Sequence, residues 1–129
     1  MSQDDVELMR KWNEAFNRRD LDAWLALMDP NIEIRSSFMG QELRGHEGAC
    51  DWWLEVEGTI PDFRVEIREI QDLGDVLLVG VSMRGHGIGS EAPFEQSPWM
   101  ATEWRDRKCV RSRGFSTKAE ALEALGLRE

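Results

Sequence analysis

The stretch "DFRVEIREIQDLGDVLLVGVSMRGH", residues 62–86, carries the clearest structural pattern in the chain. In its first part, apolar Phe63, Val65 and Ile67 alternate with arginines and glutamates. Because successive side chains of a strand point to opposite faces, this alternation predicts a strand with one buried face and one exposed face. The "LGD" at 73–75 predicts a tight turn into a second strand, "VLLVGVSMRGH". The two strands are expected to pair antiparallel.

Further strands follow this pair, and helices precede it. "FEQSPWMATEW" and "CVRSRGF" have the character of strands and are joined by the short turn "RDRK". Apolar residues at three- and four-residue steps predict helices from Val6 to Phe16, in "LDAWLALM" and in "EGACDWWLEVEG", with a strand "NIEIRSSF" before the third helix. A short last helix, "STKAEALEALG", begins with a capping box of Thr117 and Glu120.

This order of elements predicts an α+β fold in a single domain over residues 1–129. Sequential strands with short connections form an antiparallel sheet. We expect this sheet to curve around the three N-terminal-side helices into a cone, with a short C-terminal helix at the end. The interior of such a cone is a natural ligand cavity.

The segment "GHGIG", residues 85–89, allows three interpretations: a phosphate-binding loop, the lip of a catalytic pocket, or the turn of a hairpin. A dinucleotide fingerprint needs a glycine turn followed by a helix, whose N-terminus meets the phosphate. Here "SEAPFEQSPW" follows, with prolines and a strand pattern. Pro98 fits an edge, a bulge or a strand start. We therefore expect a strand that runs into a hairpin loop, and no nucleotide or other cofactor.

The composition argues against several classes of partner. The chain of 129 residues has a formal net charge of −9 at pH 7, so nucleic acid and anionic membrane surfaces are poor partners. No apolar run is long enough to span a membrane, and the acidic start "MSQDDVELMRKW" is unlike a signal peptide, which favours a cytoplasmic protein. Cys50 and Cys109 lack metal-ligand spacing and the histidines form no cluster, so no metal is expected.

Four strings, "ELMRKWNEAFNRRDLDAWLALMDPNIEI", "LRGHEGACDWW", "RVEIREIQDLGDVLLVGVSMRG" and "ATEWRDRKCVRSRGFSTKAEALEALGL", together cover nearly the whole chain. In these strings and in its order of elements the chain resembles SnoaL-like members of the nuclear transport factor 2-like superfamily, which have a cystatin-like α+β fold. The resemblance implies an apolar pocket between the first three helices and the inner sheet face. It also implies a homodimer packed through the outer sheet face. It fixes no activity, because this fold hosts isomerases, dehydratases, cyclases, hydrolases and binding domains.

Ketosteroid isomerase, one relative within this superfamily, uses a carboxylate base together with a tyrosine and a protonated aspartate as an oxyanion hole. By the resemblance, Trp12 stands at the tyrosine position, Ser36 at the base position and Ser97 near the aspartate position. The chain contains no tyrosine, and tryptophan and serine do not exchange protons near neutral pH. The resemblance therefore argues against ketosteroid isomerase activity.

If the protein is an enzyme, His86 is the candidate acid–base residue. The resemblance to SnoaL-type cyclases and dehydratases implies a histidine in the pocket, and His86 is the only histidine on a candidate pocket strand. Histidine is the side chain most often used for acid–base catalysis near neutral pH. Arg84, on the same strand face, and Arg113, on the last strand, would stabilise a developing enolate oxygen. A lone histidine at a strand end is also commonly a solvated residue, and Glu103 is the one carboxylate that we consider as its partner.

The six tryptophans and five phenylalanines suggest what such a pocket binds. Two hypotheses follow. The first is a cofactor-free protein with a hydrophobic pocket for a small, largely apolar molecule, which would carry out isomerase, cyclase or dehydratase chemistry if His86 is catalytic. The second is a non-catalytic binding or dimerisation domain whose cavity is filled by its own tryptophans. The missing tyrosine and strand carboxylates favour binding without catalysis. The residues expected to line the cavity are Trp12, Phe16, Trp24, Ser36, Phe38, Trp52, Trp53, Ser97, Trp99 and Phe115.

Overall fold

The computed structural model describes residues 2–36, 41–89 and 92–127 of the chain. Over these ranges the chain forms four helices and seven strands, which confirms the predicted α+β class. The longest described helix has 16 residues, and no described helix combines the length and apolarity needed to cross a membrane. The elements are α1 (Ser2–Asn17), α2 (Leu21–Ala26), β1 (Met28–Arg35), β2 (Glu42–Arg44), α3 (Gly45–Thr59), β3 (Arg64–Asp72), β4 (Leu77–His86), β5 (Pro93–Gln96), β6 (Trp99–Arg105), β7 (Lys108–Phe115) and α4 (Lys118–Ala124).

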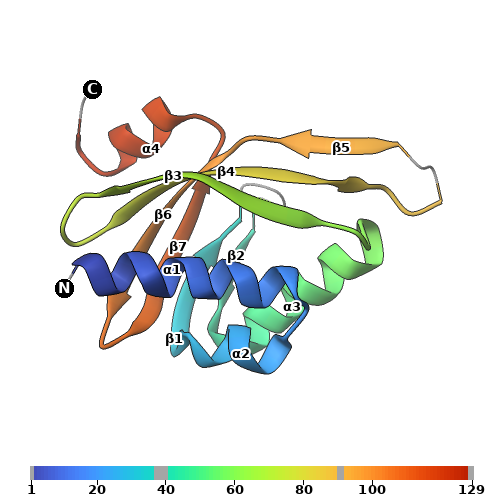
Figure 1. Ribbon diagram of the computed structural model, residues 1–129, viewed down its shortest axis with the longest axis horizontal. Coiled ribbons are helices and arrows are strands. Elements are labelled where there is room, and N and C mark those ends of the chain that lie inside the picture. The colour runs from blue at the N-terminus through green and yellow to red at the C-terminus, as the bar shows by residue number, and fades with distance from the viewer. Residues whose placement is uncertain (1, 37–40, 90–91, 128–129) are drawn as a thin grey trace.

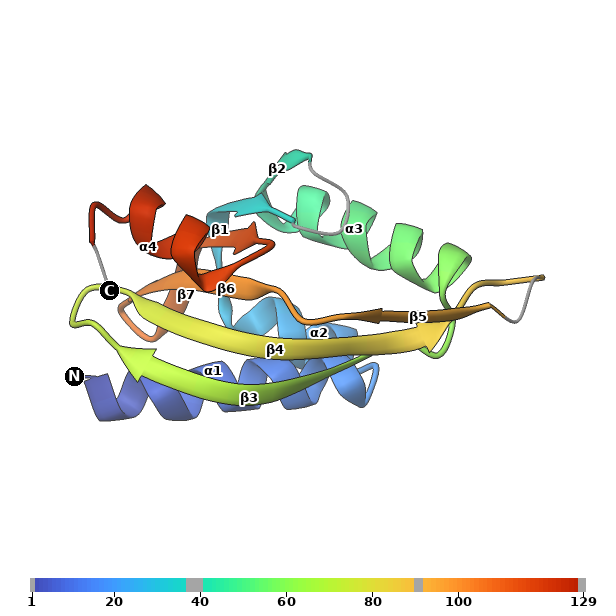
Figure 2. The same cartoon turned by 90° about the horizontal axis from the view of Figure 1, so that it is seen from above.

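The strands form one curved, open sheet in the order β2-β1-β7-β6-β4-β3, and β5 pairs with the far end of β4 (Figures 1 and 2). The described pairs are antiparallel except β1 and β7, which run parallel. The sheet is therefore mixed, whereas we predicted an antiparallel sheet. A short turn fixes the relative direction of two successive strands, but most of the chain separates β1 from β7, so no turn constrains that pair.

The three N-terminal-side helices pack on one face of the sheet, as predicted, and enclose the main hydrophobic core. The alternation read from the sequence explains this core, because Phe63 and Val65 are buried while Arg64 between them is exposed. Val79 and Val81 on β4 are also fully buried. Helix α1 contributes its apolar stripe, and the other helices add large side chains. The helical residues buried in this core are Leu8, Met9, Trp12, Ala15, Phe16, Trp24, Ala49, Trp53 and Val56.

Two asparagines of α1 hold that helix against the edge strand β3. Asn17 donates from Nδ2 to the Val65 carbonyl at 2.7 Å and accepts from the Val65 N–H through Oδ1 at 3.0 Å. Asn13, one turn earlier, donates to the same carbonyl at 3.0 Å. These amides take the place of a further strand, so both backbone groups of Val65 are satisfied at an edge that would otherwise present unpaired polar groups.

The short helix α4 packs on the opposite face of the sheet. Its N-terminus has the predicted capping box, in which Thr117 Oγ1 accepts from the Glu120 N–H at 3.1 Å and the Glu120 carboxylate accepts from the Thr117 N–H. The helix covers part of the outer face, through which we predicted a homodimer. That dimer stays a prediction, because the structure contains a single chain. The buried residues of this second, smaller core are Leu78, Ala101, Phe115, Ala121 and Leu122.

The "GHGIG" segment belongs to a hairpin, as predicted. Strands β4 and β5 pair antiparallel, with His86 opposite Pro93. Gly89 has a φ of +78°, a left-handed conformation that glycine adopts without steric cost and that suits a tight turn. Gly85 is buried, and a Cβ atom at this position would meet the Ile60 side chain and lie 3.2 Å from the Phe63 Cα. The glycines therefore serve a turn and a close backbone approach.

Candidate functional site

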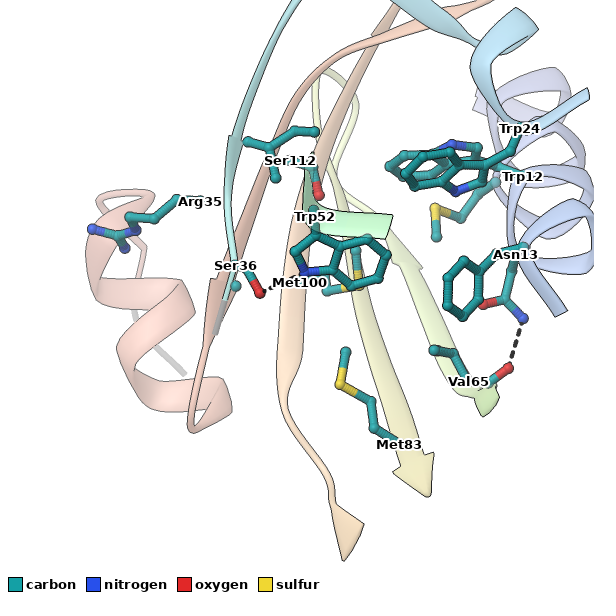
Figure 3. Close-up of a pocket in the computed structure, with 14 residues that line it drawn as sticks. Trp12, Asn13, Trp24, Arg35, Ser36, Trp52, Val65, Met83, Met100 and Ser112 are labelled. Carbon is teal, nitrogen blue, oxygen red and sulfur yellow. Dashed lines mark hydrogen bonds between the residues drawn. The ribbon is translucent and has the colours of Figure 1, made fainter. Parts of the chain in front are cut away.

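A cavity of about 90 Å³ lies between the three helices and the inner face of the sheet (Figure 3). We call it the apolar pocket. Helix α1 supplies one side, α2 and α3 supply one tryptophan each, and β3, β4, β6 and β7 supply the floor. Apolar side chains account for most of its surface. The lining residues are Met9, Trp12, Asn13, Phe16, Trp24, Ile34, Arg35, Ser36, Trp52, Val65, Met83, Met100, Ser112 and Gly114.

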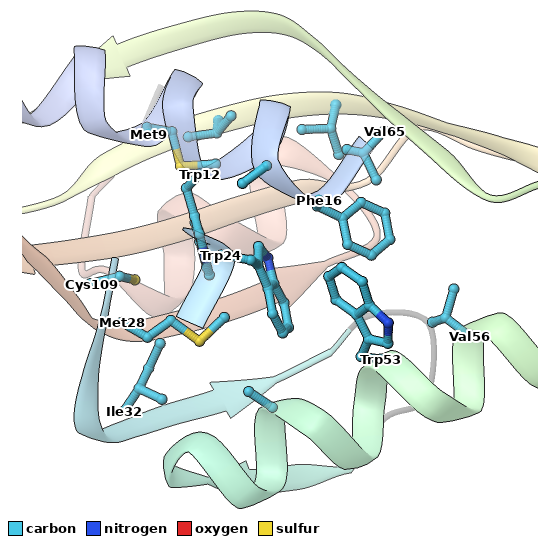
Figure 4. Close-up of a cluster of buried hydrophobic side chains, with 14 of the residues drawn as sticks. Met9, Trp12, Phe16, Trp24, Met28, Ile32, Trp53, Val56, Val65 and Cys109 are labelled. Carbon is cyan, nitrogen blue, oxygen red and sulfur yellow. The ribbon is translucent and has the colours of Figure 1, made fainter. Parts of the chain in front are cut away.

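Four aromatic rings form one wall of the apolar pocket. Trp24 stacks on Trp12 with ring centroids 6.4 Å apart and on Trp52 with centroids 5.9 Å apart. Phe16 lies 5.3 Å from Trp52 in a tilted arrangement. Behind this wall, Trp53 packs 5.0 Å from Trp24, so that Trp24 lies between Trp12 and Trp53 (Figure 4). Aromatic pairs prefer offset and tilted arrangements. Such pairs stabilise a cluster by more than the burial of their apolar surface alone.

Apart from Arg35, the polar groups of the apolar pocket are few and uncharged. The Trp52 indole N–H donates to Ser36 Oγ at 3.2 Å. The Asn13 amide nitrogen donates to the Val65 carbonyl, which leaves the Asn13 oxygen toward the interior (Figure 3). Ser112, on β7, is only 5% exposed, and its hydroxyl points toward the cavity (Figure 3). The buried Trp12 indole N–H has no hydrogen-bond acceptor among the described residues.

Among the described lining residues, only Arg35 carries an ionisable side chain, and it points away from the cavity (Figure 3). Its guanidinium lies 5.2 Å from the centroid of the Phe115 ring, which belongs to the outer face of the sheet. The described lining therefore offers aromatic faces, thioethers, a carboxamide and hydroxyls. None of these groups exchanges a proton near neutral pH.

Arg84 does not reach the apolar pocket. On β4, Met83 lines the pocket, so the alternation of the strand turns Arg84 to the outer face. There Arg84 is exposed and lies 3.5 Å from Glu95 and 4.0 Å from Glu66. Surface ion pairs of this kind contribute little to stability. The expectation that Arg84 stabilises charge within the pocket is not met by this geometry.

His86 also lies outside the described lining of the apolar pocket. Its side chain is 60% exposed at the end of β4. Asp62, in the turn before β3, accepts from the His86 backbone N–H at 2.7 Å and lies 2.8 Å from the His86 Nδ1. The carboxylate partner of His86 is therefore Asp62, whereas we had considered Glu103 for that role. The pair pins the end of β4 to the segment between α3 and β3.

The Asp62–His86 contact predicts a pH-dependent stability. The hydrogen bond from the His86 side chain, followed by that from its backbone N–H, holds the pKa of Asp62 below its usual value of 3.8. A carboxyl whose pKa is lower in the folded state stabilises that state at neutral pH, and the contribution disappears as the pH falls through the lowered pKa. We expect Asp62→Asn to reduce the melting temperature at pH 7 and to have a smaller effect near pH 3.

Thermal unfolding of the Asp62→Asn variant and the parent protein at the two pH values measures this difference. Asp51→Asn, an exposed carboxylate on α3, is the control. An Asp62→Asn effect of equal size at both pH values would show that the carboxylate contact contributes nothing.

Arg113 lies on the outer face, separated from the apolar pocket by the sheet. Its neighbours on β7, Ser112 and Gly114, line the pocket. The Arg113 side chain is 16% exposed and shares one carboxylate oxygen of Glu103, at 3.7 Å, with Arg111, at 3.6 Å. Burial, followed by repulsion from Arg111, lowers the pKa of Arg113. Arg113 is therefore part of a charged outer-face cluster and does not meet His86 in one cavity.

The predicted ligand-binding residues divide by face. Trp12, Phe16, Ser36 and Trp52 line the apolar pocket, together with Trp24. Of the others, Trp53 is buried in the core behind the wall. Ser97 is exposed, while Trp99 and Phe115 pack beneath α4 on the outer face. Phe38 lies outside the described residues.

Sequence reasoning missed Asn13, Met83, Met100 and Ser112. A signal existed for Ser112, which is the small residue between two arginines in "RSR" and so occupies the opposite face of that strand. Met83 and Met100 each have an apolar or small residue within two positions on both faces of the strand, so alternation gives little contrast. Asn13 neighbours Trp12 on the helix, and nothing local distinguishes it from a solvated residue.

A curved sheet with helices packed over one face and an apolar pocket between them defines a class of small α+β proteins with a cystatin-like fold. The sequence model of the SnoaL-like domain matches residues 9–112. The chain belongs to the SnoaL-like domain family. No curated protein matches it in sequence.

Solved structures share this fold. A hypothetical protein with a ketosteroid isomerase-like fold from Catenulispora acidiphila, in complex with trimethylamine, has a TM-score of 0.78 and 19% identity over 95% of this chain and 94% of that chain. A nuclear transport factor 2-like protein of unknown function from Burkholderia pseudomallei has a TM-score of 0.79 and 19% identity over 93% and 95%. A candidate polyketide cyclase from Xanthomonas campestris has a TM-score of 0.73 and 19% identity over 95% and 96%. At such low sequence identity, the likeness shows a common fold but does not show a common activity.

Proposed function

We propose that the protein binds a small, uncharged and largely apolar molecule in the apolar pocket. The observation that carries this proposal is the lining itself, in which aromatic rings and thioethers surround a few neutral polar groups. Ligand pockets typically combine an apolar surface with a small number of placed polar groups. Without an ionisable group directed inward from the described lining, the pocket is suited to retain a neutral molecule.

The size of the apolar pocket limits the ligand. At about 90 Å³ the cavity is well below the roughly 300–1,000 Å³ of pockets for drug-sized ligands. A molecule of one ring or less is the expected occupant, with small adjustments of the wall. Trp52 is the side chain best placed to adjust, because it is half-buried and its indole N–H has a single partner, Ser36.

The relatives support a small-molecule role without specifying a reaction. One neighbour is described in complex with trimethylamine and another as a candidate polyketide cyclase. The alternative function is a cofactor-free isomerase, cyclase or dehydratase that uses His86 as acid and base. The Asp62 carboxylate at 2.8 Å favours it, since a carboxylate commonly orients a catalytic imidazole. The exposure of both groups and their place outside the pocket lining favour binding.

Probe molecules test the proposed function. Toluene and naphthalene are the probes, and thermal unfolding at increasing probe concentration measures binding, because a ligand of the folded state raises the melting temperature. We expect toluene to stabilise the protein. In Trp52→Ala the lost indole enlarges the cavity, so naphthalene is expected to bind at least about tenfold more tightly than to the parent, through the additional apolar surface buried.

Leu54→Ala is the control for the enlarged pocket, since Leu54 lies on the same helix with 66% of its surface exposed. This variant should bind both probes as the parent does. If neither probe stabilises the parent or Trp52→Ala, the pocket does not take apolar ligands and the proposed function is wrong.

A further inference from the structure

A second concave site, which we call the arginine groove, lies on the outer face of the sheet. It has a volume of about 400 Å³ and lies where β1, β2 and β7 meet the C-terminal end of α4. We infer that the arginine groove binds a phosphate dianion, either free or as the end of a monoester, between Arg35, Arg111 and Arg113. The lining residues are Glu33, Ile34, Arg35, Glu42, Leu43, Arg44, Arg111, Arg113 and Ala124.

The fold brings the three guanidinium groups together. Arg35 lies directly opposite Arg113 on the parallel strands β1 and β7. Their guanidinium groups lie 5.2 and 6.0 Å from the centroid of the same ring, that of Phe115. Arg111, two residues before Arg113, is on the same face of β7. Nitrogen atoms of these two arginines lie 3.6 and 3.7 Å from a single Glu103 oxygen. One oxygen atom is therefore already close to two of the arginines, and the third lies on the neighbouring strand.

The Arg113 guanidinium lacks the hydrogen bonds that a mostly buried charge needs. Its side chain is 16% exposed, and its contact to Glu103 at 3.7 Å is longer than a hydrogen bond. The buried Nε has no acceptor, and no other nitrogen of the group donates to the described residues. Burial, followed by repulsion from Arg111, lowers the pKa of Arg113, and Arg35 adds to the repulsion. Because a buried charge without hydrogen bonds is unfavourable, an oxyanion in the groove would stabilise this arrangement.

The balance of charge favours an anion with two negative charges. Among the described residues, Arg35 has no carboxylate within 4.0 Å. Arg111 and Arg113 share the carboxylate of Glu103. Three guanidinium groups and one carboxylate leave two positive charges without a partner, and a phosphate monoester carries about −1.5 to −2 near pH 7. Guanidinium groups also match phosphate geometrically, because their N–H donors pair with two oxygens at once.

Two carboxylates of the lining oppose an anion but do not neutralise the arginines. Glu33 lies opposite Arg111 and Arg44 on its two neighbouring strands, and Glu42 lies opposite Arg35. Neither carboxylate forms an ion pair within 4.0 Å with the part of the chain that the structure describes. The groove is thus a local basic site on a chain with a net charge of −9. The overall charge repels large polyanions, so a small anion is the expected ligand.

Calorimetric titration with inorganic phosphate, at an ionic strength kept constant with chloride, tests the inference. We expect Arg35→Gln and Arg111→Gln each to weaken binding by roughly tenfold or more, the effect of losing a hydrogen bond to a charged group. Both side chains are substantially exposed, so these variants should keep the fold. Arg64→Gln, which removes an exposed arginine from β3 at the opposite edge of the sheet, is the matched control and should bind as the parent does.

Glu103→Gln should change the affinity in the opposite direction. It removes the negative charge that competes with phosphate for Arg111 and Arg113, so this variant is expected to bind phosphate more tightly than the parent. General damage to the fold would not produce tighter binding. Glycerol phosphate distinguishes the two sources of the dianion, since tighter binding than that of inorganic phosphate indicates a monoester and equal binding indicates free phosphate.

The inference is overturned if phosphate shows no saturable binding to the parent. It is also overturned if Arg35→Gln and Arg111→Gln bind phosphate as the parent does, or if Arg64→Gln weakens binding as much as they do. The proposed function is independent of this outcome, because the arginine groove and the apolar pocket lie on opposite faces of the sheet. Toluene binding should therefore be the same in Arg111→Gln as in the parent.

Discussion

Trp24→Ala is expected to lower the free energy of unfolding by about 3–5 kcal/mol, the range for loss of a large aromatic side chain from a core. Trp24 is 5% exposed and its ring contacts those of Trp12, Phe16, Trp52 and Trp53, with centroid distances between 5.0 and 6.4 Å. Its removal opens a void at the junction of α1, α2 and α3. Since domains are stable by only about 5–15 kcal/mol, this single change removes a large part of the total.

Chemical denaturation and thermal unfolding measure the loss, which corresponds to a decrease in melting temperature of roughly 10–20 °C for a domain of this size. Trp24→Phe is the matched control, because it keeps an aromatic ring in the cluster and should lose less. Added indole should restore part of the stability of Trp24→Ala by filling the void. A Trp24→Ala protein as stable as the parent would mean that the aromatic wall does not hold the helices over the pocket.

Gly85→Val is expected to destabilise the fold by about 3 kcal/mol or more, at or beyond the upper end of the usual range for overpacking a core. A Cβ atom at Gly85 would meet the Ile60 side chain, the Asp62 carboxylate at 3.1 Å and the Phe63 backbone at 3.2 Å. The Phe63 backbone is part of the connection into β3 and cannot rotate away as a side chain does. The Asp62 carboxylate is also engaged with His86, so the substitution disturbs that contact as well.

Gly58→Ala is the matched control for Gly85→Val. Gly58 lies within α3, and a Cβ atom there meets nothing within 4 Å. Alanine in an exposed helical position is favoured over glycine by up to about 1 kcal/mol, so this variant should be as stable as the parent or more stable. If Gly85→Val unfolds at the same denaturant concentration as the parent, the glycine does not serve a close backbone approach.

The two faces of β4 support the proposal that the protein binds a small molecule and does not transfer protons. Met83 faces the pocket, while the ionisable Arg84 and His86 at the same end of the strand are exposed to solvent. The charged groups of β7 likewise lie on the outer face. The sheet thus separates the described ionisable groups of these strands from the apolar pocket.

Much of the fold could be predicted because its signals are local. The alternation at Phe63 and Val65, the helical periodicity at Trp12 and Phe16, and the capping box of Thr117 each act within a few residues. All of them appear in the structure where the sequence places them. The parallel pairing of β1 with β7 could not be predicted in this way, since it joins strands that are distant in the sequence.

The residues of the candidate site show the same difference between local signals and the pairing of distant strands. For helices, the apolar stripe identifies the inward residues, and Trp12, Phe16 and Trp52 lie in the described lining of the pocket. For a strand, alternation defines two sets of residues but not which set faces the helices. On β4 that choice follows from its register with β3, where Val65 lies opposite Met83. Arg84 and His86 were consequently placed in the pocket when they lie outside its described lining.

The sequence by itself determined most of the helices and strands of this protein, its family and the apolar character of its interior, because periodicity, turn residues and composition are properties of short segments. It did not separate β5 from β6, which we predicted as one strand. Only the tertiary structure decided that the pocket holds Asn13 and Ser112 and lacks the charges of β4 and β7. The physical reason is that the facing of a strand depends on the neighbours with which it pairs, and those neighbours come from distant parts of the chain.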